Sequence, residues 1–117
     1  MATKLNQQAF EYAKDLIRKG RVVLDGRDAW SEHQPSAERE DEFIRVYGIR
    51  EFARWYLGMD TEVSAETKGA YKFPFGDFSR VHRCGVSSAE STAGEYPDIE
   101  DAAVHLLALM AEMAVIV

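Results

Sequence analysis

The sequence predicts a mainly α-helical protein, a compact bundle of four or five helices around the C-terminal helix with little or no β structure. Apolar residues recur at helical spacing in several segments, and glycines or capping residues separate these segments. Residues 102–117 are almost entirely apolar, which is typical of a helix at the centre of a core. The short β-branched run at residues 22–24 has no partner run of similar strength, so no free-standing sheet is expected.

Length and composition predict one domain spanning residues 1–117. The chain is 46% hydrophobic and carries a net charge of −6, an acidic balance that disfavours non-specific binding to nucleic acid. Its one cysteine excludes an internal disulfide, and the N-terminal segment lacks the apolar run of a signal peptide, so a cytoplasmic location is expected. No membrane association is predicted, because the apolar C-terminal stretch is shorter than about 20 residues and contains His105 and Glu112.

The N-terminal half shows the clearest helix signals. Asn6 is a candidate N-cap, and Gly20 can end the first helix in the left-handed conformation. Ser36 precedes an acidic first turn and is a second candidate N-cap, while Gly48 breaks the helix that follows. These signals predict a helix at residues 7–19, an extended connector at 21–26, a helix from 37 to 47 and a further helix at 49–57.

The C-terminal half is predicted to hold two more helices after an irregular segment at residues 59–76. Asp77 is the candidate cap for a helix at residues 78–93, and Asp98 caps the last helix. In the first of these, small residues stand four apart and let two helix backbones approach closely, with Ala102 and Ala103 as the candidate opposing surface. The small residues are Gly85, Ala89 and Ala93.

Candidate ligand-binding residues are few: Trp30, His33, His82, Arg83, Cys84 and His105. Trp30 and His33 lie in a segment that mixes aromatic, hydroxyl, carboxylate and imidazole groups, although the favoured interpretation is that Trp30 fills the core and the polar residues cap the next helix. On a continuous helix, His82 and Cys84 would point about 200° apart and could not chelate one ion. The sequence therefore predicts no metal site and no cofactor. A cysteine nucleophile would need a histidine within about 3 Å of Cys84, and no motif indicates such a pair.

Residues 68–83 interleave basic and aromatic side chains, with a net charge of +3. Such a block can bind single-stranded nucleic acid by stacking and phosphate contact. Since the rest of the chain is strongly acidic, nucleic-acid binding is the weaker hypothesis. Core filling by the aromatic residues is favoured instead, and the basic residues are expected to pair with an acidic partner or with the acidic segment 31–67 of the same chain.

The segments WSEHQPSAE and KFPFGDFSRVHRCGVSSAESTAG resemble parts of short, uncharacterised bacterial proteins. The resemblance covers about residues 28–107 and implies a bacterial, cytosolic setting. It implies no activity or ligand, so no functional residue can be transferred from it.

Three hypotheses of function remain open from the sequence. The first is a non-enzymatic interaction or accessory module that forms a homodimer through the C-terminal helix. Its apolar face is too wide for a small bundle to cover, which leaves an exposed edge of Val104, Leu107, Ala111 and Val115. The second is a small enzyme or ligand-binding protein that uses His33, His82, Cys84 or His105. The third is nucleic-acid binding through residues 68–83. The lack of catalytic motifs favours a non-enzyme.

Overall fold

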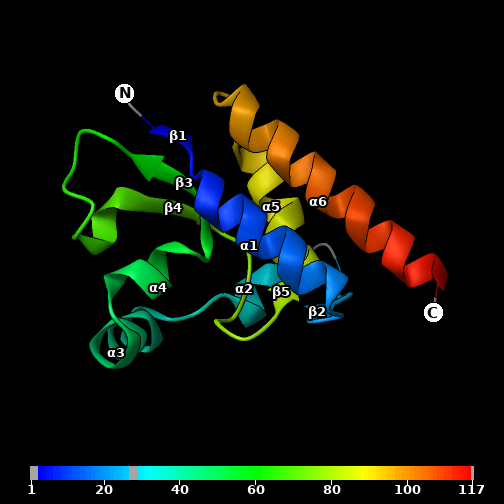
Figure 1. Ribbon diagram of the computed structural model, residues 1–117, viewed down its shortest axis with the longest axis horizontal. Helices are drawn as coiled ribbons and strands as arrows, with labels where there is room; N and C mark the ends of the chain where they lie inside the picture. The colour runs from blue at the N-terminus through cyan, green and yellow to red at the C-terminus, as the bar shows by residue number, and fades with distance from the viewer. Residues whose placement is uncertain (1–2, 27–28, 117) are drawn as a thin grey trace.

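The structure is a computed structural model that describes residues 3–26 and 29–116, with the side chains of residues 114–116 left out. Helices and short strands alternate along the chain (Figure 1). The helices are α1 (Gln7–Arg18), α2 (Trp30–His33), α3 (Ala37–Tyr47), α4 (Ile49–Ala53), α5 (Arg83–Thr92) and α6 (Pro97–Ile116), with a 3-10 turn, η2, at Lys68–Ala70. The strands are β1 (Thr3–Leu5), β2 (Val22–Val23), β3 (Tyr56–Asp60), β4 (Tyr71–Pro74) and β5 (Val81–His82).

The prediction of a helical bundle with little or no β structure is wrong, because the fold is mixed α/β. A three-stranded antiparallel sheet has the order β1-β3-β4, and a two-stranded parallel sheet joins β2 to β5. Its register pairs Val22 with Val81 and Val23 with His82. Each strand is only two to five residues long and pairs with a distant part of the chain. Periodicity within one segment carries no information on such pairing.

Three of the predicted helices are confirmed. Helix α1 ends at Arg18, and Gly20 follows with a φ of 78° in the left-handed region. Ser36 caps α3 by accepting a hydrogen bond from Arg39 N at 3.1 Å, and Gly48 ends that helix with a φ of 90°. Helix α6 occupies the apolar C-terminal segment. Asn6 stands at the N-cap of α1, but its buried side chain donates instead to the carbonyls of Ala53 and Tyr56.

Two other helix predictions are wrong in their extent. The helix predicted at residues 49–57 ends at Ala53, and the next apolar residues form the central strand β3. The helix predicted at residues 78–93 begins only at Arg83, because residues 77–80 form a tight turn and Val81–His82 is a strand. Within that turn Asp77 Oδ1 accepts hydrogen bonds from Ser79 N and Arg80 N. Asp77 therefore closes a turn and caps no helix.

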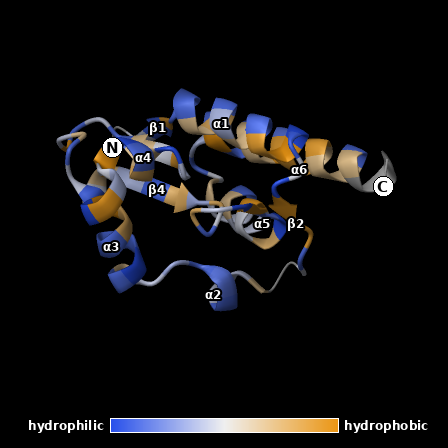
Figure 2. Ribbon diagram, turned by 60° about the horizontal axis from the view of Figure 1, so that its bottom comes forward, coloured by the Kyte–Doolittle hydropathy of each residue, from blue (hydrophilic) through white to orange (hydrophobic). Residues whose placement is uncertain are grey.

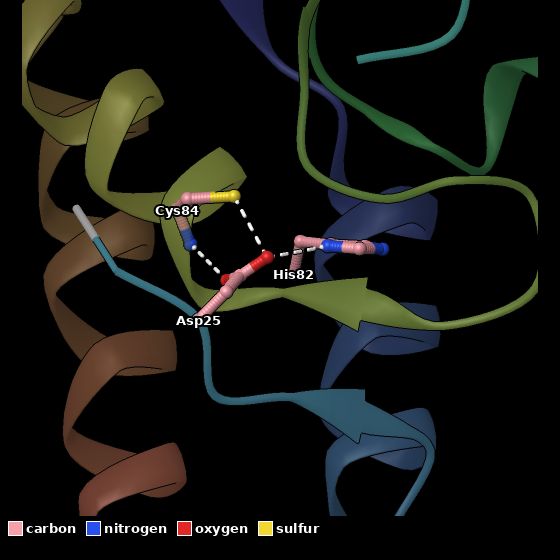
Figure 3. A group of neighbouring side chains, drawn as sticks. All are labelled: Asp25, His82 and Cys84. Atoms are coloured by element: carbon pink, nitrogen blue, oxygen red, sulfur yellow. Dashed lines mark hydrogen bonds and ion pairs between the residues drawn. The ribbon is translucent and has the colours of Figure 1, made fainter. Parts of the chain in front are cut away.

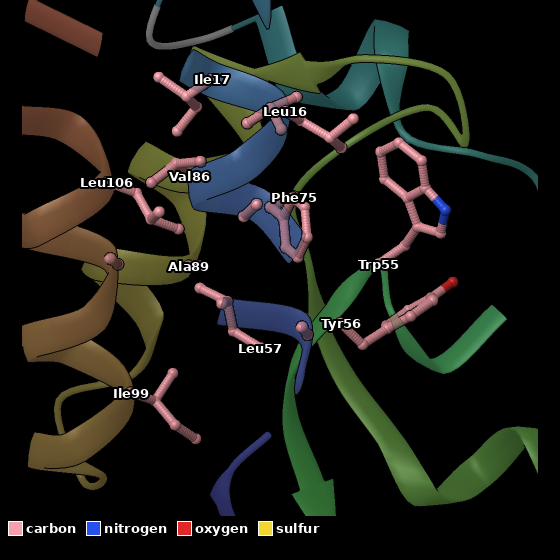
Figure 4. Close-up of a cluster of buried hydrophobic side chains, with 14 of the residues drawn as sticks. Leu16, Ile17, Trp55, Tyr56, Leu57, Phe75, Val86, Ala89, Ile99 and Leu106 are labelled. Carbon is pink, nitrogen blue, oxygen red and sulfur yellow. The ribbon is translucent and has the colours of Figure 1, made fainter. Parts of the chain in front are cut away.

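The hydrophobic core lies between α1, α5, α6 and the antiparallel sheet (Figure 4). Helix α6 runs beside α1 and α5, and its buried side chains meet those of both helices. Figure 2 shows the C-terminal end of α6 extending beyond the neighbouring elements. Among the described residues, no helix combines the length and the apolarity that crossing a bilayer requires. The fully buried core side chains include Ile17, Phe52, Leu57, Phe75, Val86, Ile99, Leu106 and Met110.

The small residues of α5 do permit close packing, as the sequence predicts. Ala89 and Ala93 are buried, and so are Ala102 and Ala103 on α6. Gly85, however, faces a different neighbour. A Cβ atom at this position would lie 2.9 Å from the backbone of Phe75 and 2.9 Å from the ring of Trp30. Gly85 therefore brings α5 against α2 and the end of β4.

Candidate functional site

Asp25 is the central residue of a polar cluster at the start of α5. It is the second residue after β2 and lies in the segment that connects β2 to α2. Arg83 fixes the backbone of this segment, since its Nε donates to Asp25 O at 3.0 Å and its Nη2 to Leu24 O at 3.3 Å. The side chain of Asp25 is only 11% exposed and points toward α5.

His82 and Cys84 converge on the Asp25 carboxylate from the junction of β5 and α5 (Figure 3). His82 Nδ1 lies 2.7 Å from Asp25 Oδ2, and Cys84 Sγ lies 3.0 Å from the same oxygen. The other oxygen, Asp25 Oδ1, accepts a hydrogen bond from Cys84 N at 2.9 Å. These ligand atoms of Asp25, His82 and Cys84 all lie within 4.8 Å of one another, and both His82 and Cys84 are buried.

Asp77 holds the far side of the His82 ring. Its Oδ2 lies 2.7 Å from His82 Nε2, while its Oδ1 accepts the two backbone N–H groups of the turn at residues 77–80. The imidazole is therefore fixed at both nitrogens, by Asp25 on one side and Asp77 on the other. A histidine oriented in this way by an outer carboxylate is a frequent arrangement at metal sites.

The cluster shifts the pKa of each of its members. Burial alone would raise the pKa of Asp25, but hydrogen bonds from Cys84 and His82 outweigh it and lower the pKa to about 2. Burial opposes the charge on His82, yet Asp77 and Asp25 together raise its pKa. Burial and the neighbouring Asp25 raise the pKa of the Cys84 thiol to about 12. The cluster thus favours ionised carboxylates at Asp25 and Asp77, the protonated form of the His82 imidazole and a neutral Cys84 thiol.

This protonation pattern argues against a catalytic cysteine. The thiolate is the reactive form of cysteine, and a carboxylate 3.0 Å from Cys84 Sγ disfavours it. The nearest histidine in the cluster, His82, binds Asp25 and Asp77 through its two ring nitrogens. Cys84 is also fully buried, so a substrate could not reach its sulfur without movement of the chain.

Two further side chains surround the cluster on its α2 side. The Trp30 ring is 8% exposed and lies 6.1 Å from the His82 ring, measured between centroids. The His33 ring lies 5.0 Å from that of His82, and its Nε2 is 3.8 Å from Asp25 Oδ2. His33 is 40% exposed, so it stands between the buried cluster and solvent.

Five of the six residues singled out from the sequence gather at this place: Trp30, His33, His82, Arg83 and Cys84. His105 does not, since it lies on α6 and packs edge-on against the ring of Phe10, with 5.6 Å between centroids. The premise that His82 and Cys84 cannot reach one ion is wrong. His82 ends a strand and Cys84 is the second residue of a helix, so helical spacing does not apply between them.

Sequence reasoning missed the two carboxylates of the cluster. Asp25 falls within the predicted connector at residues 21–26 and is not among the candidate residues, and Asp77 is predicted only as a helix cap. One sequence signal could have located the carboxylates. The β-branched residues at 22–23 and at Val81 can form two short paired strands. This pairing brings Asp25, just beyond β2, beside Cys84, just beyond β5. Parallel neighbours place the residues that follow them at the same edge of a sheet.

In the basic and aromatic block at residues 68–83, Lys68 is paired with acidic residues and two of the aromatic rings are packed inside the protein. Lys68 lies 3.1 Å from both Glu40 Oε1 and Asp41 Oδ1, in the acidic segment 31–67. Phe75 is fully buried, and Phe78 stacks on Phe43 with 4.4 Å between ring centroids. These aromatic rings fill the interior and are not arranged as an exposed stacking surface for bases.

Comparison of the chain with protein-family models, with curated proteins and with solved structures gives no match. The function is therefore inferred from the geometry of the cluster alone.

Proposed function

We propose that the protein is a small metal-binding module that holds one divalent transition-metal ion, with Zn²⁺ as the best fit, through Asp25, His82 and Cys84. The observation that carries this proposal is the convergence of a carboxylate oxygen, an imidazole nitrogen and a sulfur within 4.8 Å of one another. Zinc sites in proteins use this combination of ligands, and the sulfur disfavours Mg²⁺ or Ca²⁺.

The distances between the ligand atoms of Asp25, His82 and Cys84 allow a metal ion to replace the hydrogen bonds that join them. With metal–ligand bonds of about 2.0–2.3 Å, two ligands of a tetrahedral ion lie about 3.2–3.7 Å apart. His82 Nδ1 and Cys84 Sγ are 2.7 and 3.0 Å from Asp25 Oδ2, so these two separations have to widen by less than about 1 Å, while the third, between His82 and Cys84, is at most 4.8 Å. Sub-ångström adjustments of this kind need no change of fold.

The charge of the cluster also suits a divalent cation. The Cys84 thiol and the protonated Nδ1 of His82 both donate to Asp25 Oδ2. A metal ion displaces these two protons, because a ligating cysteine is a thiolate and a ligating histidine is neutral. When His82 is protonated at Nδ1, one divalent ion replaces two protons, and the net charge of the buried cluster stays the same. Asp77 keeps its bond to His82 Nε2 and orients the ring.

A reducing cytoplasm is the setting that we propose for this function, since metal binding needs Cys84 as a free thiol. We also retain the hypothesis of a non-enzymatic module, because the cluster holds no accessible nucleophile.

The test is metal uptake by protein prepared without an affinity tag and freed of metal with a chelator. We expect isothermal titration to show one equivalent of Zn²⁺ bound per chain. Co²⁺ should bind at the same site and give a thiolate-to-cobalt charge-transfer band in the near ultraviolet.

Two variants make this test specific. Cys84→Ser should abolish the charge-transfer band and weaken Zn²⁺ binding at least about 100-fold, since it removes a direct ligand. His105→Ala should bind as the wild type does, because His105 packs against Phe10, away from the cluster. Absence of saturable Zn²⁺ or Co²⁺ binding by the wild type would contradict the proposal.

A homodimer through α6 is a second proposal, supported by the half-exposed side chain of Val104 at 50%. Leu107 contributes less to this edge than the sequence suggests, because it packs against the core, whereas Ala111 is exposed. The side chain of Val115 lies outside the described part. We expect light scattering to give twice the 13.2 kDa chain mass, and Val104→Glu with Ala111→Glu to give the monomer mass without loss of helicity. A wild-type monomer would exclude the dimer.

A further inference from the structure

His33 lies at the edge of the cluster, outside the three residues that already converge, and a turn of its side chain would bring it toward the proposed ion as a fourth ligand. It is the last residue of α2, and its Nε2 is 3.8 Å from Asp25 Oδ2. This distance is too long for a direct hydrogen bond. It is instead close to the separation of about 3.2–3.7 Å that two ligands of one tetrahedral ion have.

The surroundings of His33 favour this role. Its ring lies beside the His82 ring with a tilt of 31° between their planes. Trp30, one turn earlier on α2, is buried against α5, so the helix that carries His33 is already fixed beside the cluster. At 40% exposure the His33 side chain can turn toward an ion without disturbing packed neighbours. Ligation by His33 requires its side chain to rotate toward Asp25, His82 and Cys84.

We infer that His33 is the fourth protein ligand and closes the metal site, an inference that rests on the proposed metal-binding function. The complete set is then one carboxylate, two imidazoles and one thiolate, from Asp25, His33, His82 and Cys84. Zinc sites closed by four protein ligands are structural, whereas catalytic sites keep one position for water or substrate. The ion therefore links α2 to the start of α5.

Cobalt spectroscopy of His33→Ala tests the inference. Four-coordinate Co²⁺ gives strong visible d–d bands, and these weaken when added water raises the coordination number. We expect His33→Ala to keep the thiolate-to-cobalt band, to lose most of the visible intensity and to bind at least about 10-fold more weakly. Added imidazole should restore the visible bands in His33→Ala, because it can occupy the vacated position. It should not restore the charge-transfer band in Cys84→Ser.

Asp77→Asn is the matched comparison for His33→Ala, because it changes a residue that acts on metal binding without contacting the ion. Asp77 orients His82 from outside the ligand set, so its loss should weaken binding while the four-coordinate spectrum stays. Trp30 fluorescence in a Trp55→Phe background gives an independent readout, because Co²⁺ held by His33 should quench Trp30 more strongly than in His33→Ala.

The outcomes separate the two proposals. If the wild type binds no metal, the proposed function fails. If the wild type binds Co²⁺ and His33→Ala shows the same affinity and the same visible spectrum, the site is open and the assignment of His33 is wrong.

Discussion

Replacing Asp25 with alanine is expected to lower the free energy of unfolding of the metal-free protein by about 3–5 kcal/mol, the usual cost of removing one partner of a buried ion pair. The carboxylate accepts hydrogen bonds from His82 Nδ1, Cys84 Sγ and Cys84 N. Its loss leaves the buried imidazolium with Asp77 alone and the Cys84 N–H without an acceptor in the first turn of α5. Urea denaturation in the presence of a chelator measures the effect.

The pH dependence of the difference in unfolding free energy between the wild type and Asp25→Ala shows whether the ionised Asp25 carboxylate causes it. The pKa of Asp25 is lowered to about 2 in the folded protein, whereas an unfolded aspartate has a pKa of about 3.9. A lowered pKa contributes stability that is present above the unfolded value and is lost as the pH falls through the folded value. The gap between the wild type and Asp25→Ala should therefore shrink as the pH is lowered from about 4 toward 2.

Asp15→Ala is the control, because Asp15 forms an exposed i,i+4 pair with Lys19. Such surface pairs contribute about 0–1 kcal/mol, so the unfolding midpoint should hardly change. If Asp25→Ala unfolded at the same urea concentration as Asp15→Ala, the cluster would not be a stabilising part of the fold.

The helices could be predicted where local signals agree. Helices α1 and α3 each combine an apolar periodicity with a glycine that ends the helix at a positive φ, Gly20 and Gly48. Both parts of this signal lie within one segment of sequence. Helix α6 is predictable for a similar reason, since its apolar content exceeds what a surface helix shows.

The strands could not be predicted in this way, because their stability comes from partners far along the chain. Strand β3 is central in its sheet and contacts β1 and β4 on its two sides. Its residues Tyr56 and Leu57 continue the helical periodicity of the preceding segment, so the pattern alone extends α4 too far. Tertiary pairing overrides a weak local preference at this point.

The candidate site was only half predictable for the same reason. His33, His82 and Cys84 are recognisable as candidates by residue type, but their convergence depends on β2 lying parallel to β5. The turn before β5 contains Phe78 at a φ of 68°. A bulky residue rarely adopts this conformation, and no sequence signal indicated it here. The predicted helix therefore begins at residue 78, five residues before α5 does. This prediction places His82 and Cys84 on opposite sides of one helix, although only Cys84 lies in α5.

Replacing Gly85 with leucine is expected to destabilise the protein by about 3 kcal/mol or more, at the upper end of what overpacking costs. A Cβ atom alone would lie 2.9 Å from the carbonyl carbon and oxygen of Phe75 and 2.9 Å from Trp30. The Phe75 carbonyl cannot move freely, because it accepts a hydrogen bond from His82 N at 3.0 Å. The larger side chain must therefore displace Trp30, or α5 must separate from the end of β4.

Thermal unfolding of metal-free Gly85→Leu measures this cost, and each kcal/mol should lower the midpoint by about 4 °C or more in a domain of this size. Gly94→Ala is the matched control, since a Cβ there has no neighbour within 4 Å and the midpoint should stay nearly unchanged. An unchanged or raised midpoint for Gly85→Leu would mean that Gly85 faces open space.

The substitution also acts on the site through Trp30, because a displaced Trp30 carries α2 and His33 away from Asp25. At a low temperature where the Gly85→Leu variant is still folded, it should therefore bind Co²⁺ with the same weakened visible bands that we expect for His33→Ala.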